Sequence, residues 1–177
     1  MPRNGFTLIE LIITVSILAI LTTVAIPSFR SLIINNRIAT QANDFVSDIS
    51  FARAEAVRRN TRITVCKSNN GTACVSAANW ENGWIIFTDP NNYGVVDTGE
   101  TILRVHGALT ANTGLVAANF NNSGNYFQFL PNGIVMGVTG GTPTTAGSFT
   151  LCYTGFNTRV LNFNTTGRIN VTTGSPC

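Results

Sequence analysis

The chain has 177 residues, of which 11% are charged and 44% are hydrophobic, and its formal net charge is +3. This length suits one domain with its own core, and so small a charge is too weak to indicate nucleic acid as a partner by itself. Part of the hydrophobic excess comes from Leu11 to Ile26, sixteen residues without a charge. The remainder is rich in Asn, Thr and Gly, which is typical of β-rich extracytoplasmic domains.

The N-terminal segment combines a short basic leader with a long apolar run. Met1 to Gly5 contains one basic side chain, and Phe6-Thr7-Leu8-Ile9-Glu10 precedes the uncharged stretch. Three ordinary interpretations compete: a signal peptide cut near Ala25, a plain membrane anchor, or a buried core helix. The 21 residues from Phe6 to Ile26 are enough to cross the hydrocarbon layer of a bilayer.

Glu10 discriminates among these interpretations. An acidic side chain at mid-membrane costs about 2.5–3.5 kcal/mol on insertion scales, and less near the interface. A signal-peptide core gains nothing from such a charge, whereas a subunit that docks on a neighbour can gain a partner for it. A charge in this position indicates function.

The basic leader, Gly5, the run from Phe6 to Glu10 and the apolar helix together resemble the class III signal of type IV prepilins and type II secretion pseudopilins. The resemblance implies that a prepilin peptidase cleaves between Gly5 and Phe6 on the cytoplasmic face, and that the new Phe6 amine is N-methylated. It also implies that Glu10 pairs with the Phe6 amine of an adjacent subunit. Such pairing would turn a costly charge into a device that sets the register of assembly.

The segment after Pro27 has the pattern of a one-sided helix. Pro27 lacks a backbone donor and is expected to kink the helix. Apolar or small residues then recur with a period near 3.6, at Ile38, Ala42, Phe45, Val46, Ile49, Ala52 and Ala56. The opposite face carries Asp44, Asp48, Glu55 and Arg59. One helix from about Phe6 to Arg59 is predicted, and its second half is expected to pack on a globular domain.

The rest of the chain has the pattern of short strands separated by Gly, Asn and Pro. The predicted strands are Thr61–Lys67, Trp84–Thr88, Thr101–His106, Tyr126–Leu130, Gly133–Gly137, Phe149–Tyr153, Arg159–Phe163 and Arg168–Val171. Pro131-Asn132-Gly133 predicts a tight turn, and residues 137–147 predict a loop. No helical pattern alternates with the strands, which favours an α+β fold with a long N-terminal helix against antiparallel sheet.

Four parts of the chain are expected from these patterns and from the resemblance to type IV prepilins. Residues 1–5 are the expected leader peptide, 6–27 a transmembrane and filament-core helix, 28–60 an amphipathic helix, and 61–177 a periplasmic β-rich head.

The four cysteines, Cys66, Cys74, Cys152 and Cys177, all lie beyond the apolar segment. They form no C-x-x-C pair, and with one histidine in the chain a zinc site is poorly supported. Their even number favours disulfides in an oxidising compartment such as the periplasm. Three pairings exist. The local one, Cys66–Cys74 with Cys152–Cys177, is favoured and would contribute about 2.6 and 3.5 kcal/mol by chain entropy. Buried free thiols are the alternative.

The head also carries a family resemblance. The runs that carry it are Ser50 to Val57, Val65-Cys66, Asn82 to Asp89 and Thr166-Gly167-Arg168, which are similar to FimT/FimU and GspH minor pilins. The resemblance implies a minor subunit near the tip of a type IV pilus that helps to prime assembly. It implies other major and minor pilins, the prepilin peptidase and the inner membrane as partners. An H-type pseudopilin of a type II secretion system is the first alternative.

The segment from Asp89 to Glu100 has the spacing of a calcium loop. Counted from Asp89, positions three, six, nine and twelve are Asn91, Gly94, Asp97 and Glu100, as an EF-hand loop requires. Tyr93 occupies the fifth ligand position, and the flanks have a strand pattern. A polar hairpin loop is therefore the favoured interpretation, with calcium as the alternative. No other cofactor is predicted.

Arginines provide the remaining candidates for binding. Arg53, Arg58, Arg59 and Arg62 cluster at the predicted end of the helix, where they either complement the helix dipole or form a basic face. Some FimT-like pilins bind DNA in natural transformation through a Gly-Arg-x-Arg element, and a DNA-binding pilin of this kind is the second alternative function. Gly167 and Arg168 match it, but Asn170 replaces the second arginine, which should weaken phosphate binding.

Arg159 is the other candidate for DNA contact, because a paired strand could bring it near Arg168. Nothing in the sequence supports an enzyme, and the lone His106 inside a predicted strand is interpreted as a sheet residue.

Overall fold

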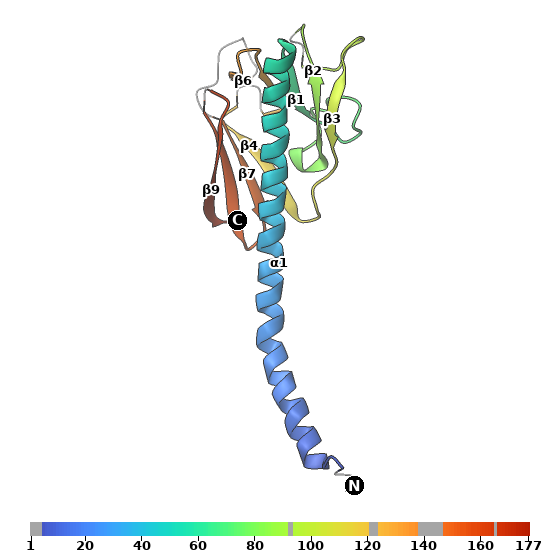
Figure 1. Cartoon of the computed structure of the whole chain (residues 1–177), viewed down its shortest axis with the longest axis vertical. Helices are drawn as coiled ribbons and strands as arrows, with labels where there is room; N and C mark the ends of the chain where they lie inside the picture. The colour runs from blue at the N-terminus through green and yellow to red at the C-terminus, as the bar shows by residue number, and fades with distance from the viewer. Residues whose placement is uncertain (1–4, 92–93, 121–123, 138–146, 165) are drawn as a thin grey trace. The chain divides into compact units, whose positions relative to one another are not determined.

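The computed structural model describes residues 5–91, 94–120, 124–137, 147–164 and 166–177. One long helix, α1 (Leu8–Arg59), opens the chain (Figure 1). The elements after it are β1 (Ile63–Lys67), the 3-10 helix η1 (Trp80–Asn82), β2 (Trp84–Thr88), β3 (Ile102–His106), β4 (Thr113–Ala118), β5 (Tyr126–Phe129), β6 (Val135–Gly137), β7 (Gly147–Tyr153), β8 (Asn157–Phe163) and β9 (Ile169–Pro176).

The described strands form two sheets in which every neighbouring pair is antiparallel. Their orders are β3-β2-β1-β5-β6 and β4-β7-β8-β9. Residues 1–37 and 38–177 form separate compact units, and α1 runs through both. In the second unit, strands of both sheets lie around the C-terminal half of α1 (Figure 1). The predicted α+β arrangement of a long helix on antiparallel sheet is confirmed.

The core of residues 38–177 consists of aromatic rings from the helix and both sheets. Phe45 of α1 lies 5.0 Å from Trp84 of β2 and 4.7 Å from Phe149 of β7, measured between ring centroids. Phe127 of β5 lies 5.8 Å from Phe149. These four side chains are fully buried, and burial of each large apolar side chain stabilises the fold by about 1.5–3 kcal/mol. Residues 38–177, called the head from here on, therefore have a hydrophobic core of their own.

The predicted elements are largely present. Helix α1 ends at the predicted residue and continues through Pro27, and a tight turn at Gly133, with φ +78°, joins β5 and β6. Strand β4 was not predicted, because Gly114 and two alanines weaken its strand pattern; its pairing with β7 forms it instead. Most of the predicted loop at 137–147 lies outside the described residues.

The helix faces differ from the prediction at three positions. Asp48 and Glu55 were assigned to the solvent face, but they are only 6% and 8% exposed. Val46 was assigned to the core stripe, yet it is half-buried and lines a surface groove. The two carboxylates are buried because other side chains cover them. Donors from distant parts of the sequence approach Asp48, and arginines of the same helix fold back over Glu55.

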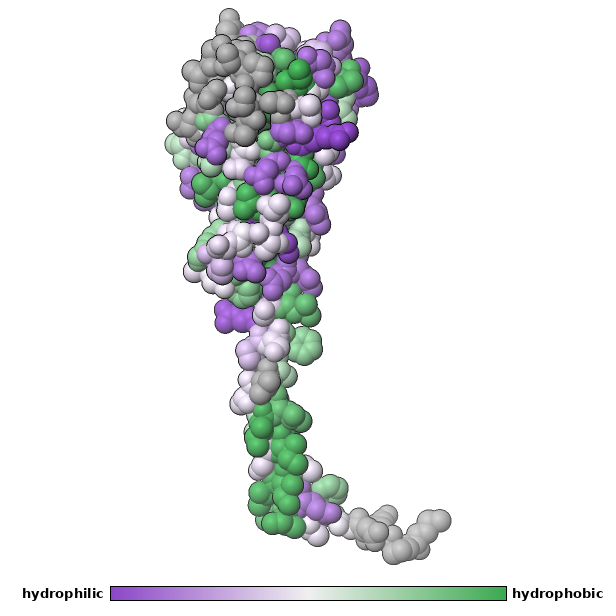
Figure 2. Space-filling view, turned by 90° about the vertical axis from the view of Figure 1, so that its left-hand side faces the viewer, coloured by the Kyte–Doolittle hydropathy of each residue, from purple (hydrophilic) through white to green (hydrophobic). Residues whose placement is uncertain are grey.

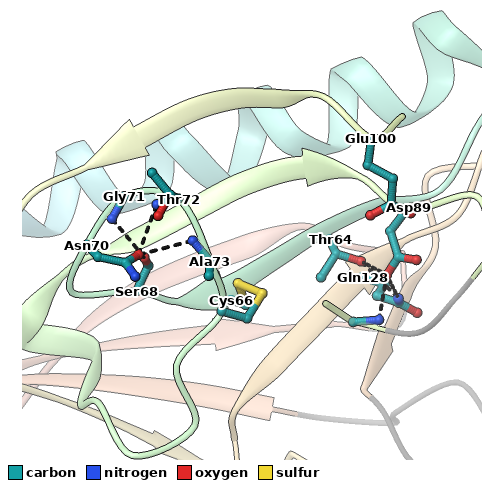
Figure 3. Close-up of a disulfide and its surroundings, with 12 residues drawn as sticks. Thr64, Cys66, Ser68, Asn70, Gly71, Thr72, Ala73, Asp89, Glu100 and Gln128 are labelled. Carbon is teal, nitrogen blue, oxygen red and sulfur yellow. Dashed lines mark hydrogen bonds between the residues drawn. A yellow bond between two sulfur atoms is a disulfide. The ribbon is translucent and has the colours of Figure 1, made fainter. Parts of the chain in front are cut away.

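The structure forms both favoured disulfides. Cys66 pairs with Cys74 and Cys152 pairs with Cys177. The first closes a short loop after β1, in which Asn70 Oδ1 accepts hydrogen bonds from the backbone of Thr72 and Ala73 (Figure 3). The second fastens the end of β9 to β7, across β8.

Candidate functional site

The first half of α1 presents large apolar side chains to its surroundings. From Phe6 to Ile26, each large apolar side chain that the structure describes is more than half exposed. Figure 2 shows this part of the helix as hydrophobic surface. By length and composition alone, α1 is apolar enough to cross a membrane. An exposed apolar surface of this extent requires lipid or protein to cover it.

The hydroxyl groups of this segment are all internally satisfied. Thr14, Ser16, Thr22 and Thr23 each donate a hydrogen bond to a backbone carbonyl three or four residues earlier. A hydroxyl that donates within its own helix needs no water. The segment therefore presents no unsatisfied hydroxyl to an apolar environment.

The carboxylate of Glu10 is held at the first turn by Thr7. Glu10 Oε2 accepts hydrogen bonds from the Thr7 backbone N–H and hydroxyl, both at 2.9 Å. The Glu10 N–H in turn donates to Thr7 Oγ1 at 3.3 Å. This reciprocal pair is a capping box, which satisfies donors that the helix start would otherwise leave unpaired. This capping box was not predicted, although Thr7-Leu8-Ile9-Glu10 has the required T-x-x-E spacing.

The first turn can also accept a cation. Glu10 Oε1 has no hydrogen-bond donor among the described residues. Phe6, four residues earlier in the chain, is 77% exposed. The Thr7 N–H belongs to the peptide bond with Phe6, so cleavage after Gly5 would leave the capping box intact. A carboxylate held in this way, with one oxygen unbonded among the described residues, is suited to bind the ammonium of another chain.

The predicted calcium residues lie in the loop between the antiparallel strands β2 and β3, as the hairpin interpretation requires. Asp89 is fully buried, and its Oδ2 accepts hydrogen bonds from Thr64 at 2.7 Å and Gln128 at 2.8 Å (Figure 3). The Gly94 N–H donates to the same oxygen at 2.9 Å. Asp89 is therefore used to tie the loop to β1 and β5.

The other loop residues bond to one another. Asn91 Nδ2 donates to Asp97 Oδ2 at 2.8 Å, and the Asp97 N–H donates to Glu100 Oε2 at 2.9 Å. Burial raises the pKa of Glu100, and the neighbouring charges of Asp89 and Asp97 add to the rise. In the described part of the chain, no three His, Cys, Asp or Glu side chains are placed to hold a metal ion. Calcium binding stays a prediction, which melting temperatures with and without calcium would test.

Three arginines from two segments that are distant in sequence line one groove on the head. We call it the arginine groove; its volume is about 630 Å³ and it is lined by Val46, Ser50, Arg53, Ala54, Val57, Arg58, Gly167, Arg168 and Ile169. Gly167 is buried with φ +73°, and a Cβ there would lie 2.7 Å from the Gly133 carbonyl oxygen and 3.3 Å from Arg53 Cδ. The glycine therefore lets the turn between β8 and β9 pack closely on the β5–β6 turn and on the Arg53 side chain of α1.

Arg159 does not join this groove. It faces Thr173 across the β8–β9 pair and donates to its hydroxyl at 2.6 Å. Arg168 precedes β9 and is five residues from Thr173, about 17 Å along a strand. The expectation that strand pairing brings Arg159 near Arg168 is wrong. Arg53 and Arg58 of α1 are the cations that share the groove with Arg168.

Of the arginines near the end of α1, two pair with the same carboxylate and a third binds a backbone carbonyl. Arg58 and Arg59 both bind Glu55, Arg58 with an N–O distance of 2.6 Å, and their hydrogen bonds lower the pKa of Glu55 to about 2. Arg53 donates to the Gly133 carbonyl at 3.0 Å. Arg62 lies after the helix, and its backbone carbonyl accepts from the Asp89 N–H. Complementing the helix dipole and forming a basic face for a partner therefore both stay predictions.

Asp48 joins the helix to β2 and β3. It accepts hydrogen bonds from Trp84 Nε1 at 3.0 Å and Arg104 at 2.7 Å, and His106 Nδ1 lies 3.0 Å from it. Burial alone would raise the pKa of Asp48, but the hydrogen bonds from His106, Arg104 and Trp84 hold it below its ordinary value. His106 also stacks on Trp84, with centroids 4.0 Å apart. His106 is thus a packed sheet residue.

Two family models match the chain. Residues 1–26 match the prokaryotic N-terminal methylation motif. Residues 41–167 match the model of type II transport protein GspH, which covers most of the chain. The chain belongs to the GspH family.

Individual relatives agree with this family. Pilin-like protein PilA1 of Thermus thermophilus is 31% identical over 108 residues, which are 60% of this chain and 61% of that relative. The chain thus matches less than two thirds of the length of this relative. The type IV minor pilin FimU of Pseudomonas aeruginosa superposes with a TM-score of 0.58 at 22% identity, over 81% of this chain and 96% of that one.

The fold is shared with a secretion component as well. The minor pseudopilin EpsH of the Vibrio cholerae type 2 secretion system gives a TM-score of 0.52 at 10% identity, over 77% of this chain and 97% of that one. At these identities the two structures show the fold alone. This GspH-family chain therefore has the fold that a type IV minor pilin and a minor pseudopilin share. The methylation motif and the apolar helix fit a membrane-anchored pilin.

Proposed function

We propose that this GspH-family chain is a minor pilin of a type IV pilus. A prepilin peptidase removes residues 1–5 and the Phe6 amine is methylated. The subunit waits in the inner membrane as a single-pass protein with a periplasmic head, and then enters the filament near its tip, where it helps to prime assembly. The observation that carries the proposal is the exposed apolar helix with a preformed carboxylate at its first turn. The likeness to a pilin-like protein supports the pilus.

The second candidate is the H-type pseudopilin of a type II secretion system. It is favoured by the description of the matching family and by the shared fold of EpsH. Deletion of the protein separates the two candidates: loss of surface filaments with normal secretion of enzymes indicates the pilus, and the reverse indicates the secretion system.

Mass spectrometry of the protein from cells tests the processing step. The expected N-terminus is methylated Phe6. An intact Met1, or a new terminus near Ala25, would contradict the proposal.

Two substitutions of Glu10 test the carboxylate. Glu10→Gln keeps an acceptor for the capping box but loses the charge, and Glu10→Ala loses both. We expect both variants to insert into the membrane and neither to be recovered in sheared filaments, since an uncompensated Phe6 ammonium is costly among packed apolar helices. Normal incorporation of Glu10→Gln would contradict charge pairing.

A further inference from the structure

The arginine groove combines an aliphatic lining with positive charge. Val46, Ala54, Val57 and Ile169 contribute the apolar part, and Val57 is 55% exposed there. No acidic residue lines the groove among the residues that the structure describes. Its volume of about 630 Å³ lies in the range of sites that enclose a bound group.

The charge of the groove is only partly balanced by the head itself. The guanidinium of Arg58 is paired with Glu55. Arg53 donates to a neutral carbonyl, and no described carboxylate pairs with Arg53 or with the exposed Arg168. Two uncompensated cations, one from α1 and one from the β8–β9 turn, therefore meet at one surface.

This combination selects for a particular ligand. A guanidinium binds a carboxylate with two parallel hydrogen bonds, and aliphatic side chains cover an apolar group beside it. Nucleic acid fits less well, because double-stranded DNA is held by about 6–10 phosphate contacts in a typical complex. The phosphate backbone also leaves the aliphatic lining uncovered.

We propose that the arginine groove binds a segment of a neighbouring filament subunit in which an aliphatic side chain lies next to an aspartate or glutamate. This inference rests on the proposed function, since the filament supplies the neighbour at high local concentration. Arg168 and Arg53 hold the carboxylate, and Val46 and Val57 cover the aliphatic side chain. The groove is thus a contact of the head, separate from the packing of the apolar helices.

Photo-crosslinking in cells that make filaments tests the proposal on the full chain. We place p-benzoylphenylalanine at Ala54, in the groove, and at the exposed Val116 of β4 as a control position. The crosslinked segment is identified by mass spectrometry. We expect an adduct from Ala54 to a filament subunit, within about two residues of an acidic side chain, as the geometry of the bidentate pair requires. Position 116 should not give this adduct.

A pair of charge variants sharpens the test. Arg168→Gln should lower the yield of this adduct about ten-fold, because a hydrogen bond between charged groups is lost. Arg159→Gln removes a cation outside the groove and should leave the yield unchanged. Three results would overturn the proposal: no adduct at Ala54, an adduct to a segment without an acidic residue, or an adduct yield that is unchanged in Arg168→Gln.

The same strains separate this proposal from the proposed function. Recovery of the chain in sheared filaments without the expected adduct overturns the groove alone, whereas absence from filaments overturns both. The full-length protein in detergent is also mixed with a short DNA duplex at low and high salt. Binding that falls steeply with salt and is lost in Arg168→Gln would assign the groove to nucleic acid and overturn the peptide proposal.

Discussion

Glu10 and Asp48 are acidic residues of the same helix, and their surroundings are opposite. Glu10 lies on an exposed apolar segment and is bonded only to Thr7 of its own first turn among the described residues. Asp48 is 6% exposed and bonded to groups from two strands. The acidic group in the head is bonded by side chains of the same chain, whereas the first half of α1 leaves its large apolar side chains exposed. A substitution in one half should therefore spare the other.

The largest effect on the head is expected from Trp84→Ala. Trp84 is fully buried, packs on Phe45 and donates to Asp48. Its removal should lower the free energy of unfolding by about 3–5 kcal/mol, measured by urea denaturation of the full chain in detergent. Val116→Ala, at a side chain that is 61% exposed, should change it by less than about 0.5 kcal/mol. A loss of less than about 1 kcal/mol for Trp84→Ala would contradict the packing of Trp84 in the core.

The two disulfides should contribute unequally. Cys152 and Cys177 are 25 residues apart in sequence, and Cys66 and Cys74 are 8 apart. Replacement of Cys152 and Cys177 by serine should cost about 3.5 kcal/mol of stability, and replacement of Cys66 and Cys74 about 2.6 kcal/mol, because the longer loop restricts the unfolded chain more. Denaturation of the two double variants measures this order, and the reverse order would contradict the entropic account.

The contrast between the two halves of α1 also explains what the sequence could predict. The apolar run, the leader and the helical period are local patterns, so the helix and its candidate role followed from them. The burial of Asp48 did not follow, since its donors Arg104 and His106 are 56 and 58 residues away. The arginine groove was not predicted for the same reason: Arg168 and Arg53 line one groove because the distant Gly167 packs beside Arg53. The capping box was the exception, because its signal was local.

Gly167→Ala should destabilise the head by about 1–3 kcal/mol, from a left-handed backbone and a clash. Gly155 is a matched control: its φ is +82°, and a Cβ there would meet nothing within 4 Å. Gly155→Ala should cost only the conformational part, about 1 kcal/mol. The difference between the two melting temperatures measures the close packing of the β8–β9 turn on the β5–β6 turn and Arg53. Equal losses would contradict that packing.

Acid should weaken the head over a defined range. The pKa of Glu55 is lowered from 4.5 to about 2 by Arg58 and Arg59, and that of Asp48 is also lowered. A lowered carboxylate pKa stabilises the fold above the unfolded value and loses this contribution as pH falls through the folded value. Stability should therefore decline between about pH 4.5 and 2. Urea denaturation across this range should show that the free energy of unfolding declines less steeply with falling pH in Asp48→Asn. An unchanged slope would contradict a contribution of Asp48 to the acid sensitivity.

The smallest expected effect lies at the other end of the helix. Thr7→Val removes the hydroxyl of the capping box and should weaken the first turn by about 1 kcal/mol, which corresponds to about five-fold faster hydrogen exchange of the first-turn amides. Thr14→Val is the control, because the Thr14 hydroxyl bonds to Leu11 within the helix and caps nothing. Neither variant should change the melting temperature of the head, since the core contains no residue from this turn. If Thr7→Val lowers that temperature, the two halves of α1 are coupled, and Glu10 and Asp48 do not belong to independently stabilised regions.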